Sequence, residues 1–181
     1  MLPKQMLVID TETTGLGSGD VILEIAAVRY SDAEDPSVIF QSLIRPPAHI
    51  TAWPEAQAIH GISPAMLQDA PSWIEVWPRL QELFADRQLA SYNWEFEKRI
   101  IQATNRSWEI NDQSEPRFGI EPGICLMKTF CSWKDSDSGK WWKLVDAATL
   151  LGIPQEGLAH RAAADALMAA RLVQAMKKAG C

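Results

Sequence analysis

Hydrophobic and polar positions change their spacing along the chain, from short apolar runs in the first part to helical spacing later. Residues 6–9, 21–30 and 37–46 are apolar runs closed by Asp, Thr, Gly, Ser or Pro, which is typical of strands joined by turns. Their short connections predict an antiparallel meander. Residues 88–91 predict a short fourth strand.

Helical spacing begins after Pro54. Ser63-Pro64 and Pro71-Ser72 resemble helix starts, and apolar residues then recur at helical intervals: Ile74, Trp77, Leu80, Leu83 and Phe84. Residues 106–122 lack periodicity and are expected to form a loop. Further helices are predicted over 94–104, 125–133, 143–153 and 160–180. Strands followed by helices predict an α/β or α+β layer fold with one mixed sheet.

The composition is that of a globular protein. The chain has 181 residues, 47% apolar and 22% charged, so we expect one domain spanning residues 1–181. Its net charge of −6 repels a polyanion, so a nucleic-acid substrate would need bound divalent cations or a local basic patch.

The cysteine spacing and the length of the apolar stretches indicate the compartment in which the protein is expected. Cys125, Cys131 and Cys181 show no paired spacing, which predicts reduced thiols and a cytoplasmic protein without a disulfide framework or a zinc ribbon. No apolar stretch reaches the ~20 residues of a membrane span, so we expect no membrane partner.

Asp10 and Glu12 stand two residues apart at the end of a predicted strand. Side chains two apart on a strand point to the same side, so the two carboxylates are expected side by side. Paired carboxylates suit Mg²⁺ or Mn²⁺. The alternative is a solvated loop start that carries two acids.

Glu95 and Glu97 begin a predicted helix. At about 100° per residue the two side chains point roughly 200° apart, so at most one can join a metal site. Phe96 between them could stack on a nucleobase or pack in the core.

His160 and Asp165 are five residues apart, which on a regular helix places them about 140° from a common face. Both can serve one site only if His160 lies on the loop that leads into the helix. A capping or surface histidine is the alternative.

Basic and aromatic residues alternate over Lys140, Trp141, Trp142 and Lys143, a pairing that suits single-stranded nucleic acid. We hypothesise that this segment borders the substrate channel. Alternatively, the tryptophans anchor the helix that begins near Leu144.

Three stretches together resemble the motifs of the histidine-bearing branch of the DEDD exonuclease superfamily: "VIDTETTGL", "SYNWEFEKR" and "HRAAADA". "ILEIAAV" and the segment beginning "AIHGI" are similar to further parts of that family. The resemblance implies a ribonuclease H-like fold, with a mixed central sheet flanked by helices. It also implies a 3′-to-5′ exonuclease that releases nucleoside monophosphates with two divalent ions, Mg²⁺ or Mn²⁺.

The resemblance also implies roles for individual residues. Asp10, Glu12 and Asp165 match metal-ligand positions, and His160 matches the general base. Glu97 takes the fourth ligand position, where the family pattern has Asp. The expected substrate contacts are Thr13, Thr14, Gly15, Leu16, His60, Asn93 and Phe96. For His60 and Phe96, a structural role remains an equal alternative.

The expected partner is the 3′ end of single-stranded DNA or RNA, with DNA preferred, and a DNA polymerase subunit remains open as a second partner. One alternative is a catalytically weakened module of the same fold that binds nucleic acid or a polymerase, since Glu97 carries an added methylene. Another is a structural protein with accidental motifs, whose stability would not respond to metal.

Overall fold

The computed structural model describes residues 2–110, 120–134, 141–155 and 160–181. In chain order its elements are β1 (Gln5–Thr13), β2 (Ile22–Ser31), β3 (Glu34–Leu43), α1 (Pro54–His60), the 3₁₀ turn η1 (Pro64–Leu67), α2 (Trp73–Phe84), β4 (Gln88–Ser91), α3 (Trp94–Ser107), β5 (Ile120–Cys125), α4 (Leu126–Lys134), α5 (Leu144–Leu150) and α6 (Ala162–Lys178).

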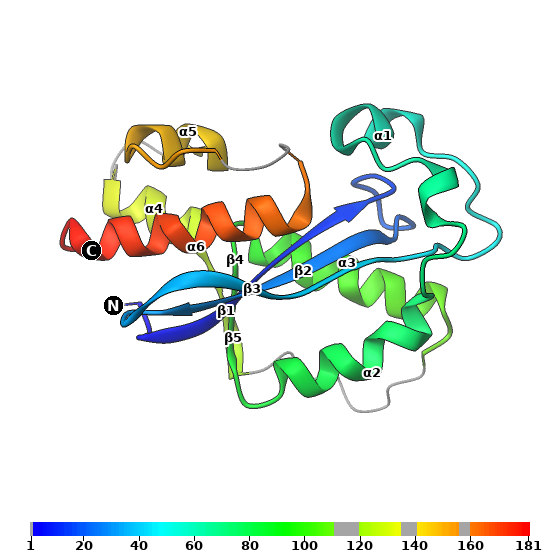
Figure 1. The fold of residues 1–181 in the computed structure, drawn as a ribbon, viewed down its shortest axis with the longest axis horizontal. Coiled ribbons are helices and arrows are strands. Elements are labelled where there is room, and N and C mark those ends of the chain that lie inside the picture. The colour runs from blue at the N-terminus through cyan, green and yellow to red at the C-terminus, as the bar shows by residue number, and fades with distance from the viewer. Residues whose placement is uncertain (1, 111–119, 135–140, 156–159) are drawn as a thin grey trace.

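The strands form one mixed sheet in the order β3-β2-β1-β4-β5 (Figure 1). The pairs β1–β2 and β2–β3 are antiparallel, which confirms the predicted meander. β4 lies parallel to β1 and to β5. A parallel neighbour needs a crossover, and the segment carrying α1, η1 and α2 provides it.

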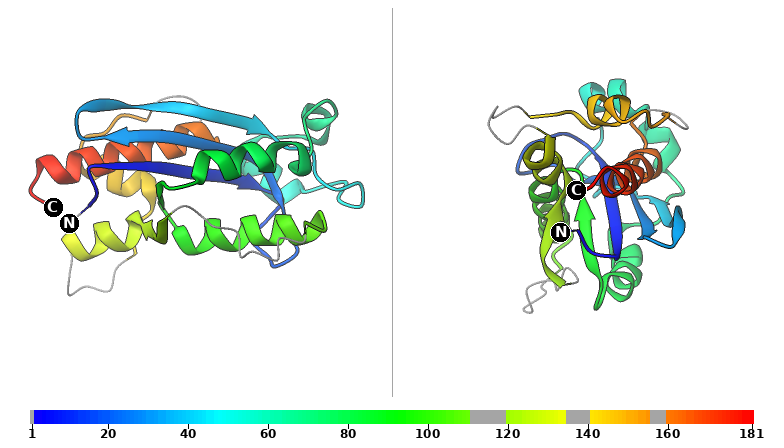
Figure 2. Two further views of the ribbon diagram at one scale, coloured as in Figure 1. Left: turned by 90° about the horizontal axis from the view of Figure 1, so that it is seen from below. Right: turned by 90° about the vertical axis from the view of Figure 1, so that its left-hand side faces the viewer.

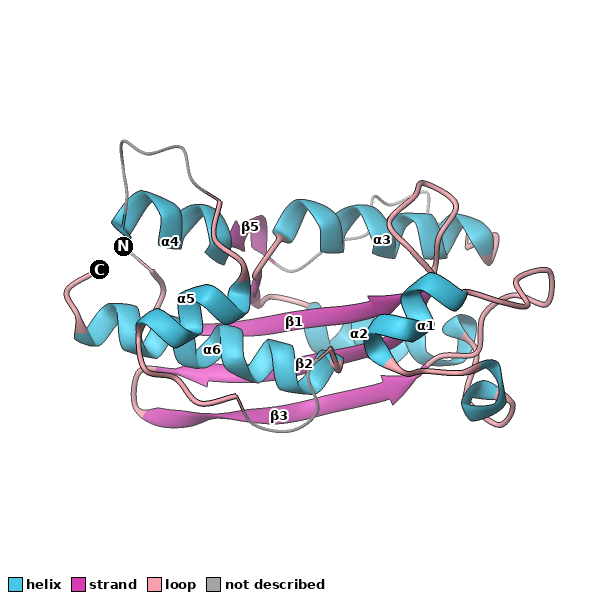
Figure 3. Ribbon diagram, turned by 90° about the horizontal axis from the view of Figure 1, so that it is seen from above, coloured by secondary structure: helices cyan, strands magenta, loops and turns pink. Residues whose placement is uncertain are grey.

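Helices cover both faces of the sheet because β1 alternates its side chains between two cores. Leu7 and Ile9 pack with residues of α2 and α3, whereas Met6 and Val8 pack with residues of α6. Figures 1 and 2 show α2 and α6 on opposite sides of the strands, and Figure 3 shows α6 running along them. This layered sheet is the ribonuclease H-like arrangement expected from the resemblance.

Several sequence predictions need correction. The loop predicted over 106–122 is wrong at its end, because β5 begins at Ile120; Pro122 and Gly123 hide this edge strand from a pattern search. The predicted helix at 125 begins one residue later because Cys125 belongs to β5. The helix predicted to start at Ser63 is only the single 3₁₀ turn η1. Helix α1 was not predicted from the spacing of apolar residues.

The start predicted at Ser72 is confirmed by a capping box. The Ser72 amide and hydroxyl both donate to Glu75 Oε2, at 2.7 and 2.6 Å. Trp77, Leu80 and Phe84 of α2 are buried as the spacing predicted, but Ile74 is 51% exposed.

Gly123 lies where β5 passes the first turn of α3, and a Cβ at this position would overlap the Trp94 indole. We expect Gly123→Ala to destabilise the fold by about 1–3 kcal/mol through overpacking. Gly19→Ala is the matched control, because a Cβ there meets nothing within 4 Å. Urea unfolding of both variants measures the difference, and equal stabilities would contradict the packing of β5 against α3.

Candidate active site

Three carboxylates meet where β1 passes the start of α6. Asp10 and Glu12 come from β1, and Asp165 comes from the first turn of α6. One oxygen of each lies within 4.8 Å of the others, close enough for one metal ion to bind all three. The alternation along β1 therefore places its two acids side by side, as the sequence indicated.

Burial and mutual repulsion make this group unfavourable as three free anions. Burial raises the pKa of Asp10 well above its ordinary value, and the charges of Glu97, Asp165 and Glu12 raise it further. Burial and the charge of Asp165 raise the pKa of Glu12 to about 8. The pKa of Asp165 is also raised by burial. A divalent cation relieves both effects, and hard oxygen donors fit Mg²⁺ or Mn²⁺.

Glu97 approaches this cluster from α3. It is only 4% exposed, and Thr11 Oγ1 donates a hydrogen bond of 2.8 Å to its Oε2. Burial raises the pKa of Glu97 to about 8 despite the hydrogen bond from Thr11. The helical phase predicted that only one glutamate could face the cluster. The structure agrees, because Glu95 lies on the surface with its carboxylate 3.5 Å from Lys128 Nζ.

His160 precedes α6 and is exposed, with φ at +55°. His160 therefore lies outside the regular helix, so the helical angle that would turn its side chain away from that of Asp165 does not apply. Its charge lowers the pKa of Asp165 against the effect of burial.

A buried ion pair holds the start of α6 against the sheet. Glu24 of β2 is fully buried, and its oxygens accept hydrogen bonds of 2.9 and 2.7 Å from Arg161. The Ala162 amide and the Gln41 side chain also donate to it. Burial alone would raise the pKa of Glu24, but these bonds outweigh it and lower that pKa. This ion pair was not predicted from the sequence. Glu24, the single acid in the apolar run "VILEIAAV", nevertheless indicates a buried charge that needs a partner.

His60 is buried, and both its ring nitrogens contact backbone. Nδ1 accepts a hydrogen bond from the Ile62 amide at 3.0 Å, and Nε2 lies 3.1 Å from the Thr13 carbonyl oxygen. Because Nδ1 accepts a hydrogen bond, Nε2 carries the ring proton and donates a hydrogen bond to the Thr13 carbonyl oxygen. This geometry supports the structural role for His60, which joins α1 to the end of β1.

The loop after β1 is folded around Asp20. Its carboxylate accepts hydrogen bonds from the Thr14 hydroxyl at 2.7 Å and from the Gly17 amide at 2.6 Å. Asp20 also lies so close to Gly15 that a Cβ there would come within 2.7 Å of its Oδ2. Leu16 is left 78% exposed at the tip.

Part of the predicted basic and aromatic segment can be placed. Lys140 lies outside the described residues. Trp142 packs edge-on against Phe130 with 5.6 Å between ring centroids, which agrees with an anchoring role, whereas Trp141 is 62% exposed. Lys143 is the N-cap residue of α5.

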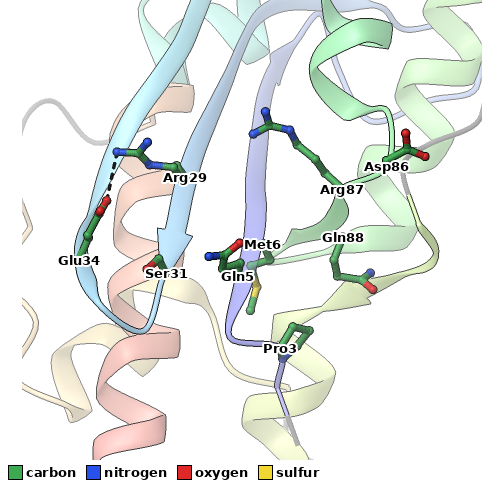
Figure 4. Close-up of a pocket in the computed structure, with 9 residues that line it drawn as sticks. All are labelled: Pro3, Gln5, Met6, Arg29, Ser31, Glu34, Asp86, Arg87 and Gln88. Atoms are coloured by element: carbon green, nitrogen blue, oxygen red, sulfur yellow. Dashed lines mark ion pairs between the residues drawn. The ribbon is translucent and has the colours of Figure 1, made fainter.

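A cavity of about 750 Å³ lies elsewhere, where β1 and β4 begin (Figure 4). Gln5, Arg29, Arg87 and Gln88 contribute to its lining, and none of the clustered carboxylates does. No described helix combines the length and apolar composition that crossing a membrane requires.

Comparisons with known proteins identify the family that this chain resembles. Residues 7–173 match the family model described as Exonuclease. The uncharacterized exonuclease CP81 of Escherichia phage 186 is 33% identical over 183 residues, covering 99% of this chain and 91% of that protein. Exodeoxyribonuclease 10 of Escherichia coli K12 is 35% identical over 101 residues, which cover 56% of this chain and 42% of that protein.

A solved structure extends the likeness to the fold. The nuclease domain of 3′hExo, described as a DEDDh family member bound to rAMP, superposes with a TM-score of 0.76 at 19% identity. The match covers 98% of this chain and 94% of that domain.

The raised carboxylate pKa values predict how stability without metal depends on pH. A carboxyl group whose pKa is raised by folding binds its proton more tightly in the folded state. Stability is therefore lost as pH rises from the ordinary 4.5 through about 8. In chelator, we expect the melting temperature to fall over this range, and Mn²⁺ to raise it most near pH 8.

Two isosteric variants isolate this effect in thermal melts. Glu12→Gln should flatten the pH dependence because it removes one of the repelling acids. Glu95→Gln, at the exposed neighbour of Glu97, should retain the wild-type slope. A melting temperature that changes neither with pH nor with Mn²⁺ would contradict the clustering of the carboxylates.

Proposed function

Because the chain belongs to the Exonuclease family and is therefore a nuclease, we propose that it removes nucleotides from the 3′ end of single-stranded nucleic acid, DNA in preference to RNA. The observation that carries this proposal is the convergence of Asp10, Glu12 and Asp165 within 4.8 Å. A buried fourth acid, Glu97, stands beside them.

The four carboxylates would hold two divalent ions. Asp10, Glu12 and Asp165 form the compact group, and Glu97 extends it from the opposite helix. Bound Mg²⁺ or Mn²⁺ supplies a lowered pKa for water and charge neutralisation at the phosphate. Thr11 holds the Glu97 carboxylate through a hydrogen bond from its hydroxyl to Oε2, which would fix the orientation of Glu97 toward the ions.

His160 acts as the general base in this proposal. It takes a proton from the attacking water, whose oxygen forms a bond to phosphorus. The bond from phosphorus to the 3′ oxygen of the preceding nucleotide breaks, and that oxygen takes a proton from solvent. The products are a nucleoside 5′-monophosphate and a strand shortened by one residue. Exposure of His160 ahead of α6 supports this role, because the imidazole can exchange protons with water.

The terminal nucleotide contacts the loop after β1 and the start of α3. Thr13, Thr14 and Gly15 bring backbone close to it, and Leu16 offers an exposed apolar surface. Asn93 and Phe96 line the neighbouring edge of α3. His60 supports this loop from behind through Thr13.

The preference for DNA is supported by the similarity to exodeoxyribonuclease 10 of Escherichia coli K12. We further propose that residues 1–181 act as one exonuclease domain, since the family match spans most of them. A polymerase partner stays a prediction.

Digestion of 3′-labelled single strands with Mg²⁺ or Mn²⁺ tests the function. We expect Asp10→Asn to abolish release of monophosphates and His160→Ala to slow it by about 10²–10⁴-fold. Glu97→Asp withdraws the carboxylate from Thr11 by about 1 Å, and we expect a loss of about 10²-fold.

The same assay separates the alternatives. Full activity of Asp10→Asn would exclude this active site. A gain of activity in Glu97→Asp would show instead that the longer side chain weakens the wild-type enzyme. Comparing DNA and RNA strands of one sequence tests the proposed preference.

A further inference from the structure

A groove of about 590 Å³ runs along the outer side of α3, the helix that also carries the buried Glu97. Its lining residues recur at helical spacing and thus form one stripe: Asn93, Glu95, Phe96, Lys98, Arg99 and Gln102. Glu97 and Ile100 point instead into the core. One helix therefore offers a carboxylate to the catalytic cluster and a polar stripe to the surface.

Arg99 joins this groove to the loop after β1. Its guanidinium donates hydrogen bonds of 3.0 Å to the Gly17 carbonyl and 3.1 Å to the Leu16 carbonyl. The same group lies 5.2 Å from the centroid of the Phe96 ring. Figures 2 and 3 show this loop beside α3. Asp20 holds the loop from its inner side, so the exposed Leu16 is fixed between two charged residues.

The chemistry of the stripe matches an unpaired strand. Lys98 and Arg99 offer positive charge to phosphates, Phe96 and Leu16 offer apolar surface to base faces, and Asn93 and Gln102 offer amides. The charge of Glu95 is directed to Lys128, 3.5 Å away. Because the whole chain carries a charge of −6, local cations of this kind are needed to hold a polyanion.

We propose that this groove on α3 binds the nucleotides on the 5′ side of the terminal one, as single-stranded nucleic acid. Arg99 then has two roles: it positions the loop that carries Leu16, and it lines the path of the strand. A duplex would present no free base faces to Phe96 and Leu16. The proposal deepens the proposed exonuclease function and rests on it for the direction of the strand.

Substrate length gives the most direct test, because the p-nitrophenyl ester of a nucleoside 5′-monophosphate has a scissile phosphate but no nucleotide on the 5′ side to occupy the groove. We expect Arg99→Ala to lower the ratio of kcat/KM on a decanucleotide to that on this ester by roughly tenfold, as for the loss of one charge-assisted hydrogen bond. Gln102→Glu, which adds a negative charge one turn away without touching the loop, should lower the same ratio. The slope of log KM against log salt concentration should decrease by about 0.7 for each phosphate contact that a variant loses.

Arg79→Ala is the matched control. Arg79 of α2 is exposed and lies 5.2 Å from the centroid of the Phe40 ring of β3. Its removal therefore changes the net charge by the same amount, but outside the groove. We expect it to leave the ratio unchanged. An equal loss on both substrates in Arg99→Ala, together with an unchanged ratio in Gln102→Glu, would show that Arg99 only holds the loop in position. That result would overturn the proposal that the groove binds the strand.

Binding without catalysis separates this inference from the proposed function. Fluorescence anisotropy of a labelled decanucleotide, measured in chelator, should show weaker binding in Arg99→Ala and Gln102→Glu than in wild type and Arg79→Ala. If wild type binds the strand in this pattern but hydrolyses nothing, the exonuclease proposal fails and the groove stands. If wild type hydrolyses the strand and all variants bind alike, only the groove is refuted.

Discussion

Repulsion among partly buried carboxylates at the end of β1 is the constraint on which the rest of the structure depends. Asp10, Glu12 and Asp165 lie within reach of one ion, and burial raises the pKa of each. Such a group opposes folding unless it is protonated or neutralised. The surrounding framework must therefore hold the acids together at a cost in stability, which is expected of a catalytic site rather than of a structural one.

The framework does this through contacts that bridge separate elements. Glu24 and Arg161 join β2 to the start of α6 and thereby fix both His160 and Asp165 relative to β1. Thr11 and Glu97 join β1 to α3. Since the two core clusters lie on opposite faces of the sheet, α6 and α3 approach the end of β1 from different sides. The two acids of β1 are thereby joined by one acid from each of these helices.

Local sequence predicted much of this arrangement. Strand alternation placed Asp10 beside Glu12, and helical phase allowed only one of Glu95 and Glu97 to face the cluster. The choice of Glu97 came from the resemblance to the family motif. The parts that escaped prediction depend on distant partners. Thr11 and Glu97 are 86 residues apart, and Arg161 and Glu24 are 137 apart, so no local pattern encodes either contact. β5 is likewise recognisable only through its pairing with β4.

The central claim is that four carboxylates, including a glutamate where the family pattern has an aspartate, hold two divalent ions. A crystal structure with Mn²⁺ and a nucleoside 5′-monophosphate, examined by anomalous scattering, tests it most directly. We expect two manganese peaks beside the four carboxylates, with the Glu97 carboxylate in contact with one of them. A single peak, or a Glu97 side chain that contacts only Thr11, would contradict it.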